Sequence, residues 1–263
     1  MRINGATVLL TGATGGIGRV LARRLADGGA SLMVTGRRED TLREVVQETG
    51  ARSMTADLAD RDDVLALADA VGEVDILVAN AALPASGDLL EYTTEQIDRA
   101  LAVNLTAPIL LARLLAPRMA EAGRGHLTFV GSMSGKAATP YSSLYTASKF
   151  GLRGFAHSLR QDLAAAGVGV SLVQPGFVSE AGMFADTGAE VPRGMRTVSP
   201  DQVADAVIHA ITADRGEINI APAKLRWRCA VAGQFPDFAS RAQRGVEPPE
   251  SVRRIVAAQR ASR

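Results

Sequence analysis

Two polar side chains that can exchange protons stand four residues apart in the segment Tyr145-Thr146-Ala147-Ser148-Lys149. On a helix, this spacing places the phenol of Tyr145 and the ammonium of Lys149 on one face. An ammonium about 4 Å from a phenolate stabilises it by roughly 4 kcal/mol at an effective dielectric near 20, which corresponds to about three pKa units. We therefore expect the pKa of Tyr145 to be near neutral pH, where an acid–base catalyst exchanges protons with an alcohol or a carbonyl.

A serine and an asparagine elsewhere in the chain could complete such a site. Ser132 follows an apolar segment, residues 126–130, that is typical of a buried strand, and doubly wound folds bind ligands at the carboxyl ends of strands. Its hydroxyl could hold a substrate oxygen, or it could simply turn the chain between neighbouring glycines. Asn104 stands in an otherwise apolar helical pattern, where an unpaired carboxamide is costly to bury. It is therefore either a satisfied core group or part of a proton relay.

A glycine-rich turn near the N-terminus predicts a binding site for a dinucleotide. The turn reads Thr11-Gly12-Ala13-Thr14-Gly15-Gly16-Ile17-Gly18 and lies between a strand-like segment and a helical pattern. Glycines permit a tight turn and let the backbone approach a pyrophosphate, whose charge then lies at the positive end of the helix. The spacing differs from Gly-x-Gly-x-x-Gly, and a glycine-rich turn alone could be only a tight connection. The prediction of a dinucleotide site therefore depends on the order of a strand, the glycine turn and a helix.

The end of the second predicted strand indicates which dinucleotide would bind. A protein that binds the unphosphorylated cofactor usually presents an acid to the ribose there, whereas this chain reads Thr35-Gly36-Arg37-Arg38. A guanidinium can pair with a 2′-phosphate through two parallel hydrogen bonds. We therefore expect Arg37 to favour NADP(H) over NAD(H). The competing interpretation is a solvated arginine pair that Glu39 and Asp40 partly neutralise.

These residues need a scaffold, and the chain predicts one by alternating short apolar segments with longer helical patterns. The strands are nearly continuous apolar runs, typical of parallel strands covered by helices on both faces. We expect an α/β fold, a doubly wound parallel sheet of seven strands of the Rossmann type. The predicted strands span residues 7–10, 31–35, 52–55, 74–79, 126–130, 168–173 and 217–220. The predicted helices span residues 16–28, 39–49, 61–71, 94–122, 145–166 and 200–213, the last one starting with a capping box.

Composition and charge exclude several classes of protein. Hydrophobic residues make up 47% of the 263 residues, enough for a buried core. The 29 basic and 28 acidic residues nearly cancel, so no nucleic-acid partner is expected. The single cysteine, Cys229, cannot form an internal disulfide or a thiolate metal cluster, and we assign no metal site. Neither a run of 18 apolar residues nor a signal peptide is recognised. We therefore expect a cytoplasmic protein.

Residues 224–263 differ from the rest and are predicted to form a tail that follows a domain of residues 1–223. The tail carries nine basic and three acidic residues, whereas the first 223 residues carry 20 and 25. With Trp227, Phe235 and Phe238, it could lie on an anionic membrane surface or on a partner subunit. Because its basic residues are scattered, we favour a solvated, partly helical appendage. The chain has only three lysines, Lys136, Lys149 and Lys224, so we also mark these positions for inspection.

Together these motifs resemble the classical short-chain dehydrogenase/reductase family. The resemblance covers about residues 5–222 and rests on the glycine turn, Asn80-Ala81-Ala82, Asn104, Ser132, Tyr145 and Lys149 in the family's order. The gap of 13 residues from Ser132 to Tyr145 also matches. The glycine pattern fits the family's extended branch as well. Only about 40 residues follow the last predicted strand, however, which is too few for the substrate domain of an extended member.

The resemblance implies a catalytic role for four residues. Tyr145 would be the general acid or base, and Lys149 would lower the pKa of Tyr145 and hold the nicotinamide ribose. Ser132 would position the substrate oxygen. Asn104 would hold a relay water behind Lys149.

The resemblance also implies where the dinucleotide lies. Asp57 and Leu58 would contact the adenine, Asn80 would lie beside the adenosine ribose, and the turn at residues 175–176 would lie near the nicotinamide. The full set of expected cofactor-binding residues is Gly12, Thr14, Gly16, Ile17, Gly18, Arg37, Asp57, Leu58, Asn80, Tyr145, Lys149, Pro175, Gly176 and Val178.

Two departures from the family pattern affect this site. The usual Asn-Asn-Ala-Gly reads Ala79-Asn80-Ala81-Ala82, so backbone packing there should differ a little. After Pro175-Gly176-Phe177-Val178, the family usually has a threonine that holds the nicotinamide carboxamide, where this chain has Ser179-Glu180. The sequence leaves open how the carboxamide is held.

The activity expected is hydride transfer that interconverts a ketone or aldehyde and a secondary or primary alcohol with NADP(H). The partner expected is a small-molecule substrate, and the resemblance implies a homodimer or homotetramer built partly from the two long helices. Two alternatives are a non-catalytic dinucleotide-binding scaffold or redox sensor, and an extended-type epimerase or dehydratase. Apolar residues near the site predict an apolar substrate that is lipid-, steroid- or polyketide-like, unless they pack a lid against the body. They are Met133, Tyr141, Met183, Phe184, Val191 and Met195.

Overall fold

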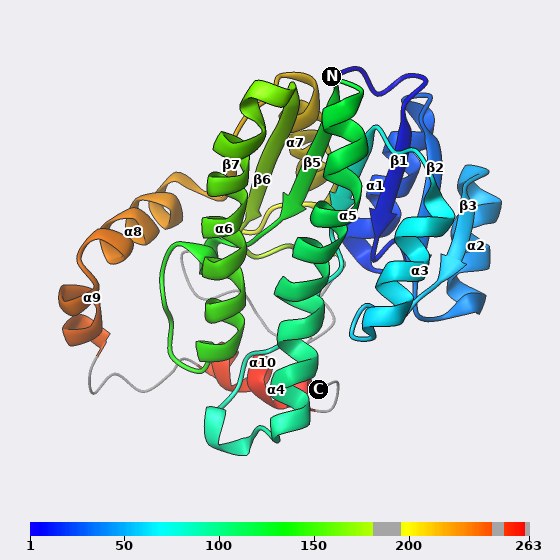
Figure 1. Ribbon diagram of the computed structural model, residues 1–263. Coiled ribbons are helices and arrows are strands. Elements are labelled where there is room, and N and C mark those ends of the chain that lie inside the picture. Colours follow the sequence, from blue (N-terminus) through cyan, green and yellow to red (C-terminus); the bar gives the residue numbers. More distant parts are fainter. Residues whose placement is uncertain (181–195, 244–249, 261–263) are drawn as a thin grey trace.

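A computed structural model describes residues 1–180, 196–243 and 250–260 and confirms the doubly wound fold (Figure 1). Seven strands, all parallel, form one sheet in the order β3-β2-β1-β4-β5-β6-β7. The predicted strands agree with the observed ones to within two residues at either end. The strands are β1 (Thr7–Thr11), β2 (Ser31–Gly36), β3 (Arg52–Thr55), β4 (Ile76–Ala79), β5 (Gly125–Val130), β6 (Val168–Pro175) and β7 (Glu217–Ile220).

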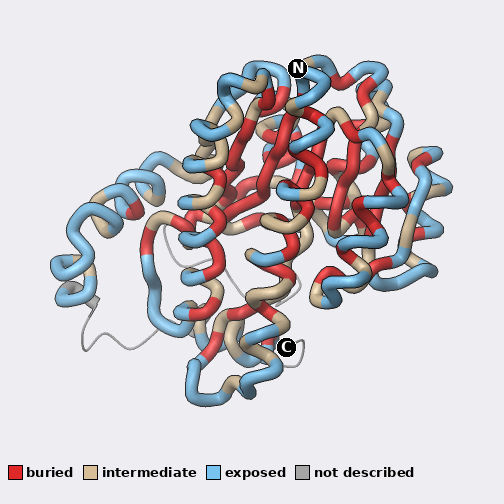
Figure 2. Tube along the Cα trace, viewed as in Figure 1, coloured by how far each residue is buried: buried red, intermediate tan, exposed pale blue. Residues whose placement is uncertain are grey.

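Helices cover both faces of the sheet and bury its apolar side chains. Val8 and Leu10 of β1 face one core with α1, α2 and α7, whereas Leu9 between them faces the other core with α3, α5 and α6. This alternation follows from the period of two residues along a strand, and Figure 2 shows the strands buried between the helical layers. The helices are α1 (Gly16–Asp27), α2 (Glu39–Thr49), α3 (Arg61–Val71), α4 (Thr94–Leu101), α5 (Ala107–Glu121), α6 (Ser143–Leu163) and α7 (Pro200–Thr212).

The predicted capping box begins α7. The main-chain amide of Gln202 donates to the Ser199 hydroxyl at 3.1 Å, and the amide of Ser199 donates to the Gln202 side chain at 2.9 Å. Pro200 occupies the first turn, where its missing amide hydrogen costs no helical bond. The chain therefore enters α7 where the sequence predicted.

The predicted single helix over residues 94–122 is wrong in one respect. A π-helical turn, Ala102–Thr106, separates α4 from α5. The amide of Ala107 donates to the carbonyl of Ala102, five residues back. Pro108 has no amide hydrogen to offer the carbonyl of Asn104, as a continuous α-helix would require. The proline therefore accounts for the irregular turn, and Asn104 lies within it.

The same region, Thr94–Glu121, is long and apolar enough to cross a membrane by length and composition alone. Half of its most apolar stretch is buried inside the protein. Leu111, Leu115 and Met119 belong to the core beneath the sheet. Packing against the sheet thus accounts for the apolar character of this helix.

The tail is helical where it is described and consists of α8 (Ala223–Gln234), α9 (Pro236–Gln243) and α10 (Glu250–Arg260). α8 and α9 project from the body (Figure 1), whereas Arg260 of α10 pairs with Glu91, just before α4, at 3.2 Å. Cys229 of α8 packs against Met133 and Ala137. The side chain of Gln259 accepts a hydrogen bond from the amide of Ser86 at 3.1 Å. The tail is thus helical and mostly exposed, as expected, but α8 and α10 each bury a side chain against the body, which was not expected.

Candidate active site

A cleft of about 250 Å³ lies at the carboxyl edge of the sheet, where the strand order reverses between β1 and β4. Ligands of doubly wound folds bind at this reversal, because the loops that leave neighbouring strands diverge there. Nine predicted cofactor residues line the cleft: Gly12, Thr14, Gly16, Ile17, Gly18, Arg37, Asp57, Leu58 and Asn80. Eight further residues that the sequence analysis did not assign to the cofactor also line it: Gly15, Thr35, Gly36, Ala56, Ala81, Ala82, Leu83 and Val103.

The glycine turn needs its glycines for three separate reasons. Gly12 has a φ of +67°, and a Cβ there would lie 2.7 Å from the Cα of Ala81. A Cβ on Gly18 would overlap the carbonyl oxygen of Gly12, so only glycine lets α1 start this close to the turn. Gly15, the N-cap of α1, has no side chain to occupy the first amides of the helix. The turn thus offers an anion the amides and the positive dipole end of α1, which fits a pyrophosphate.

Asn80 holds this turn from the end of β4. Its side-chain amide donates to the carbonyls of Thr11 and Gly12, both at 3.2 Å. In return, the Thr11 hydroxyl accepts from the main-chain amides of Asn80 and Ala81, both at 3.1 Å. The structure therefore gives Asn80 a loop-positioning role, and its expected place beside the adenosine ribose stays a prediction.

Arg37 lies exposed at the rim of the cleft, at the end of β2. Its guanidinium makes no hydrogen bond or ion pair with any residue that the structure describes. Glu39, expected in the competing interpretation to neutralise this position, pairs instead with Arg43 at 3.0 Å. The guanidinium of Arg37 is thus available to an anionic group in the cleft.

Asp57 lies across the cleft from the glycine turn and is held by an arginine that the sequence analysis missed. Its carboxylate accepts from Arg99 of α4 at 2.8 Å and from the amide of Ala59 at 3.0 Å. Burial raises the pKa of Asp57, but the hydrogen bonds from Arg99 and Ala59 and the charge of Arg37 outweigh it, so the pKa lies below its usual range. Asp57 is therefore ionised at neutral pH and fixed in place.

The predicted catalytic residues meet next to this cleft. Ser132 follows the end of β5, and its side chain forms a hydrogen bond with that of Tyr145 on α6. Lys149 lies one turn further along α6, with its Nζ 5.7 Å from the centroid of the Tyr145 ring. The Lys149 ammonium donates to the carbonyl of Val130, the last residue of β5, at 3.1 Å. The structure thus brings the serine, the tyrosine and the lysine together as the spacing predicted.

The electrostatics of this group differ from the prediction. Burial raises the pKa of the Tyr145 phenol above its ordinary value, and the hydrogen bond from Ser132 opposes this only partly. Burial lowers the pKa of Lys149 to about 8. The expected phenol pKa near neutral is wrong for this arrangement, because burial of Tyr145 outweighs the hydrogen bond from Ser132.

Asn104 is buried in the π-helical turn and fully hydrogen-bonded through its side chain. Its carboxamide oxygen accepts from the amide of Leu83 at 2.6 Å, and its NH₂ group donates to the carbonyl of Leu83 at 3.0 Å. The side chain is therefore a satisfied core group that holds the wall of the cleft. A relay role for Asn104 stays a prediction and would fall to its main-chain carbonyl, which receives no hydrogen bond from Pro108.

The remaining predicted residues lie at the end of β6, outside the cleft described above. Gly176 donates from its amide to the carbonyl of Ile220 at 2.9 Å, next to Pro175 at the end of β6. Val178 is buried in the core and forms an isolated bridge with Val198. Any contact of Val178 with a cofactor would therefore use its main chain. Glu180 has a φ of +69°, a strained conformation for a residue other than glycine.

The predicted apolar lining is only partly tested by the structure. Met133 is buried against Cys229 and the α8 residue Leu225, so it contributes to the core beneath α8. Its predicted place in the substrate lining is therefore wrong. Tyr141 is 41% exposed in the loop that leads to α6. The other four predicted lining residues lie outside the described residues: Met183, Phe184, Val191 and Met195.

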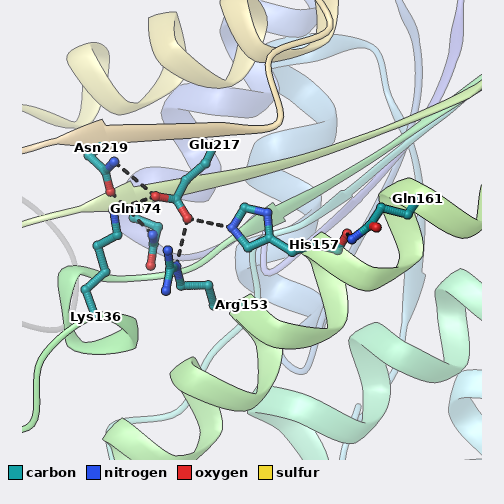
Figure 3. A network of polar contacts seen from close by, with 7 residues as sticks. All are labelled: Lys136, Arg153, His157, Gln161, Gln174, Glu217 and Asn219. Carbon is teal, nitrogen blue, oxygen red and sulfur yellow. Dashed lines mark hydrogen bonds and ion pairs between the residues drawn. The ribbon is translucent and has the colours of Figure 1, made fainter. Parts of the chain in front are cut away.

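A partly buried ionic network around Glu217 was not predicted (Figure 3). Glu217 of β7 pairs with Lys136 at 2.5 Å, Arg153 at 2.8 Å and His157 at 2.7 Å. Asn219 donates to the same carboxylate at 3.1 Å. Burial raises the pKa of Glu217, but the hydrogen bonds from Lys136, Arg153, His157 and Asn219 lower it to about 2. The rarity of lysine marked Lys136 for inspection, but no feature of the sequence indicated its partner.

Comparisons with known proteins agree with this geometry. A family model described as short chain dehydrogenase matches residues 6–191. The ketoacyl reductase HetN of a Nostoc species is 35% identical over 218 residues, which are 80% of this chain and 76% of that protein. A metagenomic short-chain oxidoreductase solved in complex with NADP is 34% identical with a TM-score of 0.71, covering 84% of this chain and 99% of that chain. A short-chain dehydrogenase from Sphingobium yanoikuyae solved in complex with NADPH is 26% identical with a TM-score of 0.76, covering 93% and 99%.

Proposed function

Because this chain belongs to the short-chain dehydrogenase/reductase family, we propose that it is an NADP(H)-dependent oxidoreductase that interconverts a ketone or aldehyde and the corresponding alcohol. The observation that carries the reaction is the hydrogen bond between Ser132 and Tyr145 beside the buried Lys149. A proton donor, a second hydroxyl and a cation in one place can bind and protonate a carbonyl oxygen.

In the direction of reduction, the substrate carbonyl carbon gains a hydride and its oxygen gains a proton. The nicotinamide, when bound, supplies the hydride. Ser132 donates a hydrogen bond that orients the substrate oxygen, and Tyr145 transfers its phenolic proton to that oxygen. The Lys149 ammonium stabilises the phenolate left on Tyr145, an interaction worth more in this buried site than in water. In oxidation the same groups act in reverse, with Tyr145 as the base.

The preference for NADP(H) is supported by Arg37 at the rim of the cleft. No acid stands at the end of β2 to bind an unmodified ribose, and the Arg37 guanidinium is free of partners among the described residues. Two similar solved structures hold NADP or NADPH. The pyrophosphate would lie on the glycine turn at α1, and the 2′-phosphate would pair with Arg37.

An apolar carbonyl compound is the proposed substrate class. The relative HetN is named a ketoacyl reductase, so a 3-oxoacyl thioester is the first compound to test, beside simple and steroid-like ketones. The test is oxidation of NADPH with each compound, for the natural protein and for Tyr145→Phe. Turnover that Tyr145→Phe removes supports an oxidoreductase. The absence of turnover with every carbonyl and alcohol tried would favour a non-catalytic dinucleotide-binding protein.

A further inference from the structure

We propose that α8 and α9 form a docking surface for an anionic lipid bilayer. The surface consists of three aromatic residues, Trp227, Phe235 and Phe238, and of basic residues among them, Lys224, Arg226 and Arg228. We call it the α8–α9 surface. The proposal does not depend on the catalytic activity proposed above.

The aromatic side chains are unusually exposed for their size. Trp227 is 68% exposed, Phe235 60% and Phe238 68%. Elsewhere in the described chain only Leu90 among the large hydrophobic residues exceeds half exposure. The three exposed aromatic rings lie within twelve residues of the chain, and exposed apolar residues that gather in one region mark interaction sites more often than scattered single residues do.

Trp227 points away from the body. Cys229 of α8 is buried against Met133 and Ala137, and Trp227 precedes it by two positions, so the two side chains lie on opposite sides of the helix. Figure 1 shows α8 and α9 projecting from the body, and Figure 2 shows them mostly exposed. The body thus leaves the surface open for an approaching partner.

The charges on the same helices are mostly positive, and the basic side chains form no ion pair with a residue that the structure describes. Residues 223–243 contain four basic residues and one acidic residue. The basic residues are Lys224, Arg226, Arg228 and Arg241, and the acidic residue is Asp237. None of the four basic side chains forms an ion pair with a residue in the described parts of the chain. Several arginines of the body are paired instead, for example Arg99 with Asp57 at 2.8 Å and Arg160 with Asp214 at 2.8 Å. The positive charge of the α8–α9 surface is therefore available to an external anion.

Aromatic rings beside free cations suit the interface of an anionic bilayer. Trp and Phe insert at the level of the headgroups, and each nearby Lys or Arg gains from the negative surface potential. A second copy of this chain is a less suitable occupant, because a twofold contact places the same patch on both sides and sets like charges against each other. Charge complementarity thus favours the bilayer.

The surface also lies close to the candidate active site. α8 starts three residues after β7, and Leu225 packs with Met133, the residue after Ser132. Docking through α8 would therefore place the carboxyl edge of the sheet near the lipid. Given the proposed function, an apolar substrate could then enter from the membrane without crossing water.

The protein carries its own probe for this proposal, because Trp227 is its only tryptophan. Titration with phosphatidylcholine vesicles that contain 30% phosphatidylglycerol should shift the Trp227 emission to shorter wavelength, and pure phosphatidylcholine vesicles should not. Raising the salt concentration should weaken the binding, because salt screens exposed charges. Sedimentation with the same vesicles gives an independent affinity.

Charge-reversal variants separate this surface from the rest of the protein. Arg226→Glu combined with Arg228→Glu should weaken sedimentation with the anionic vesicles by about tenfold or more, since each basic residue near such a surface contributes about 1 kcal/mol. The matched control is Arg23→Glu with Arg61→Glu, two exposed arginines of the body, which should bind as the natural protein does. NADPH affinity, measured separately, shows that each variant is folded.

Several results would overturn the proposal. They are no emission shift with anionic vesicles, equal binding to neutral vesicles, or equal loss in both double variants. A shift that grows with protein concentration in the absence of vesicles would identify a second copy as the occupant instead. Neither measurement requires turnover, so failure of the proposed activity would leave this test intact.

Discussion

Tyr145 and Lys149 are both buried, and burial moves their pKa values in opposite directions. The pKa of Tyr145 rises and that of Lys149 falls to about 8, because each neutral form is favoured in a poorly solvated site. A phenolate on Tyr145 next to an ammonium on Lys149 offsets the cost of burying each charge, because the two charges attract each other. The two residues should therefore act as one unit in proton transfer rather than as independent groups.

We predict that the effects of mutating this pair do not add. Tyr145→Phe removes the proton donor, so turnover should fall by at least roughly 10² to 10⁴ while NADPH still binds. Lys149→Ala should reduce both turnover and cofactor binding. The double variant should be scarcely slower than the worse single variant. The measurement is single-turnover hydride transfer, with NADPH affinity determined by fluorescence. Strictly additive losses would contradict the coupling.

A second prediction concerns the choice of cofactor. Arg37→Ala should weaken NADP(H) much more than NAD(H), because a charge-assisted contact contributes about 1.5 to 3 kcal/mol, roughly tenfold to more than a hundredfold in affinity. Arg38→Ala is the matched control, since Arg38 is exposed but does not line the cleft. Equal weakening of both cofactors by Arg37→Ala would contradict a contact with the 2′-phosphate.

Single residues also mark the limit of what the sequence predicts. The glycine turn, Ser132, Tyr145 and Lys149 were predictable because their spacing along the chain is part of their chemistry. The partner of Asp57 was not, because Arg99 lies on α4, 42 residues away, and no periodicity links the two. Long-range ion pairs depend on the register between elements, which a pattern in one segment does not contain.

At the scale of elements, Glu217 joins three parts of the fold that carry or follow catalytic residues. It belongs to the edge strand β7, Lys136 follows the turn of Ser132, and Arg153 and His157 lie on α6 beyond Lys149. Because the Glu217 side chain is only 14% exposed, losing one partner leaves buried charges uncompensated, which is costly. The network therefore fixes α6 against the sheet from behind the site.

The network makes a specific contribution to acid stability. The pKa of Glu217 is about 2 in the folded chain and 4.5 when unperturbed, so its stabilisation is complete above pH 4.5 and is lost as the pH falls towards 2. The shift corresponds to about 3 kcal/mol. Glu217→Gln should remove this dependence and lower stability at neutral pH, measured by urea unfolding. The exposed Glu73→Gln should change neither.

His126 should act in a different pH window. It is 2% exposed on β5, and its Nε2 lies 2.8 Å from the hydroxyl of Ser171. Burial lowers its pKa from 6.5 to about 4, so the unfolded chain binds a proton first. Stability should be complete above pH 6.5 and fall by about 3 kcal/mol as the pH drops to 4.

The matching experiment compares two histidines. His126→Gln should flatten the pH dependence of urea unfolding between pH 6.5 and 4, whereas His209→Gln, at an exposed position on α7, should keep the natural slope. An unchanged slope in His126→Gln would show that other groups cause the loss of stability.

The pair of Ser171 and His126 resembles a nucleophile and its base, but Ser171 is fully buried in the sheet and offers a substrate no access.

At the scale of the whole molecule, sequence patterns predicted the sheet well and the tail poorly. The periodicity of apolar residues along the chain indicates the alternation of strands and helices, so the seven strands were predictable. The contacts of α8 and α10 rest on few residues, such as Cys229 and Gln259, among many exposed ones. Charge and composition average over such a segment, so they do not reveal the contacts that attach it to the body.

We predict that removing residues 224–263 destabilises the protein without affecting its cofactor cleft. Truncation would expose Met133 and Ala137, which Cys229 and Leu225 now cover, at a cost of roughly 2 to 4 kcal/mol in stability. The cleft is lined by residues 12–103, so NADPH affinity should change less than about twofold. Thermal unfolding and fluorescence titration measure the two effects. Unchanged stability after truncation would support the interpretation of the tail as a solvated appendage.

The π-helical turn before α5 makes the length of this segment matter as much as its composition. Each residue of a helix advances the next by about 100°, so the insertion of one further residue between Leu101 and Ala107, beyond the extra residue that the π-helical turn already holds, would rotate α4 by that amount relative to α5. Ala100 would then turn away from Leu144, with which it packs, and Arg99 would leave Asp57. Substitutions here change one side chain at a time, whereas a single inserted residue would change how the cofactor cleft lies relative to the helix that carries Tyr145.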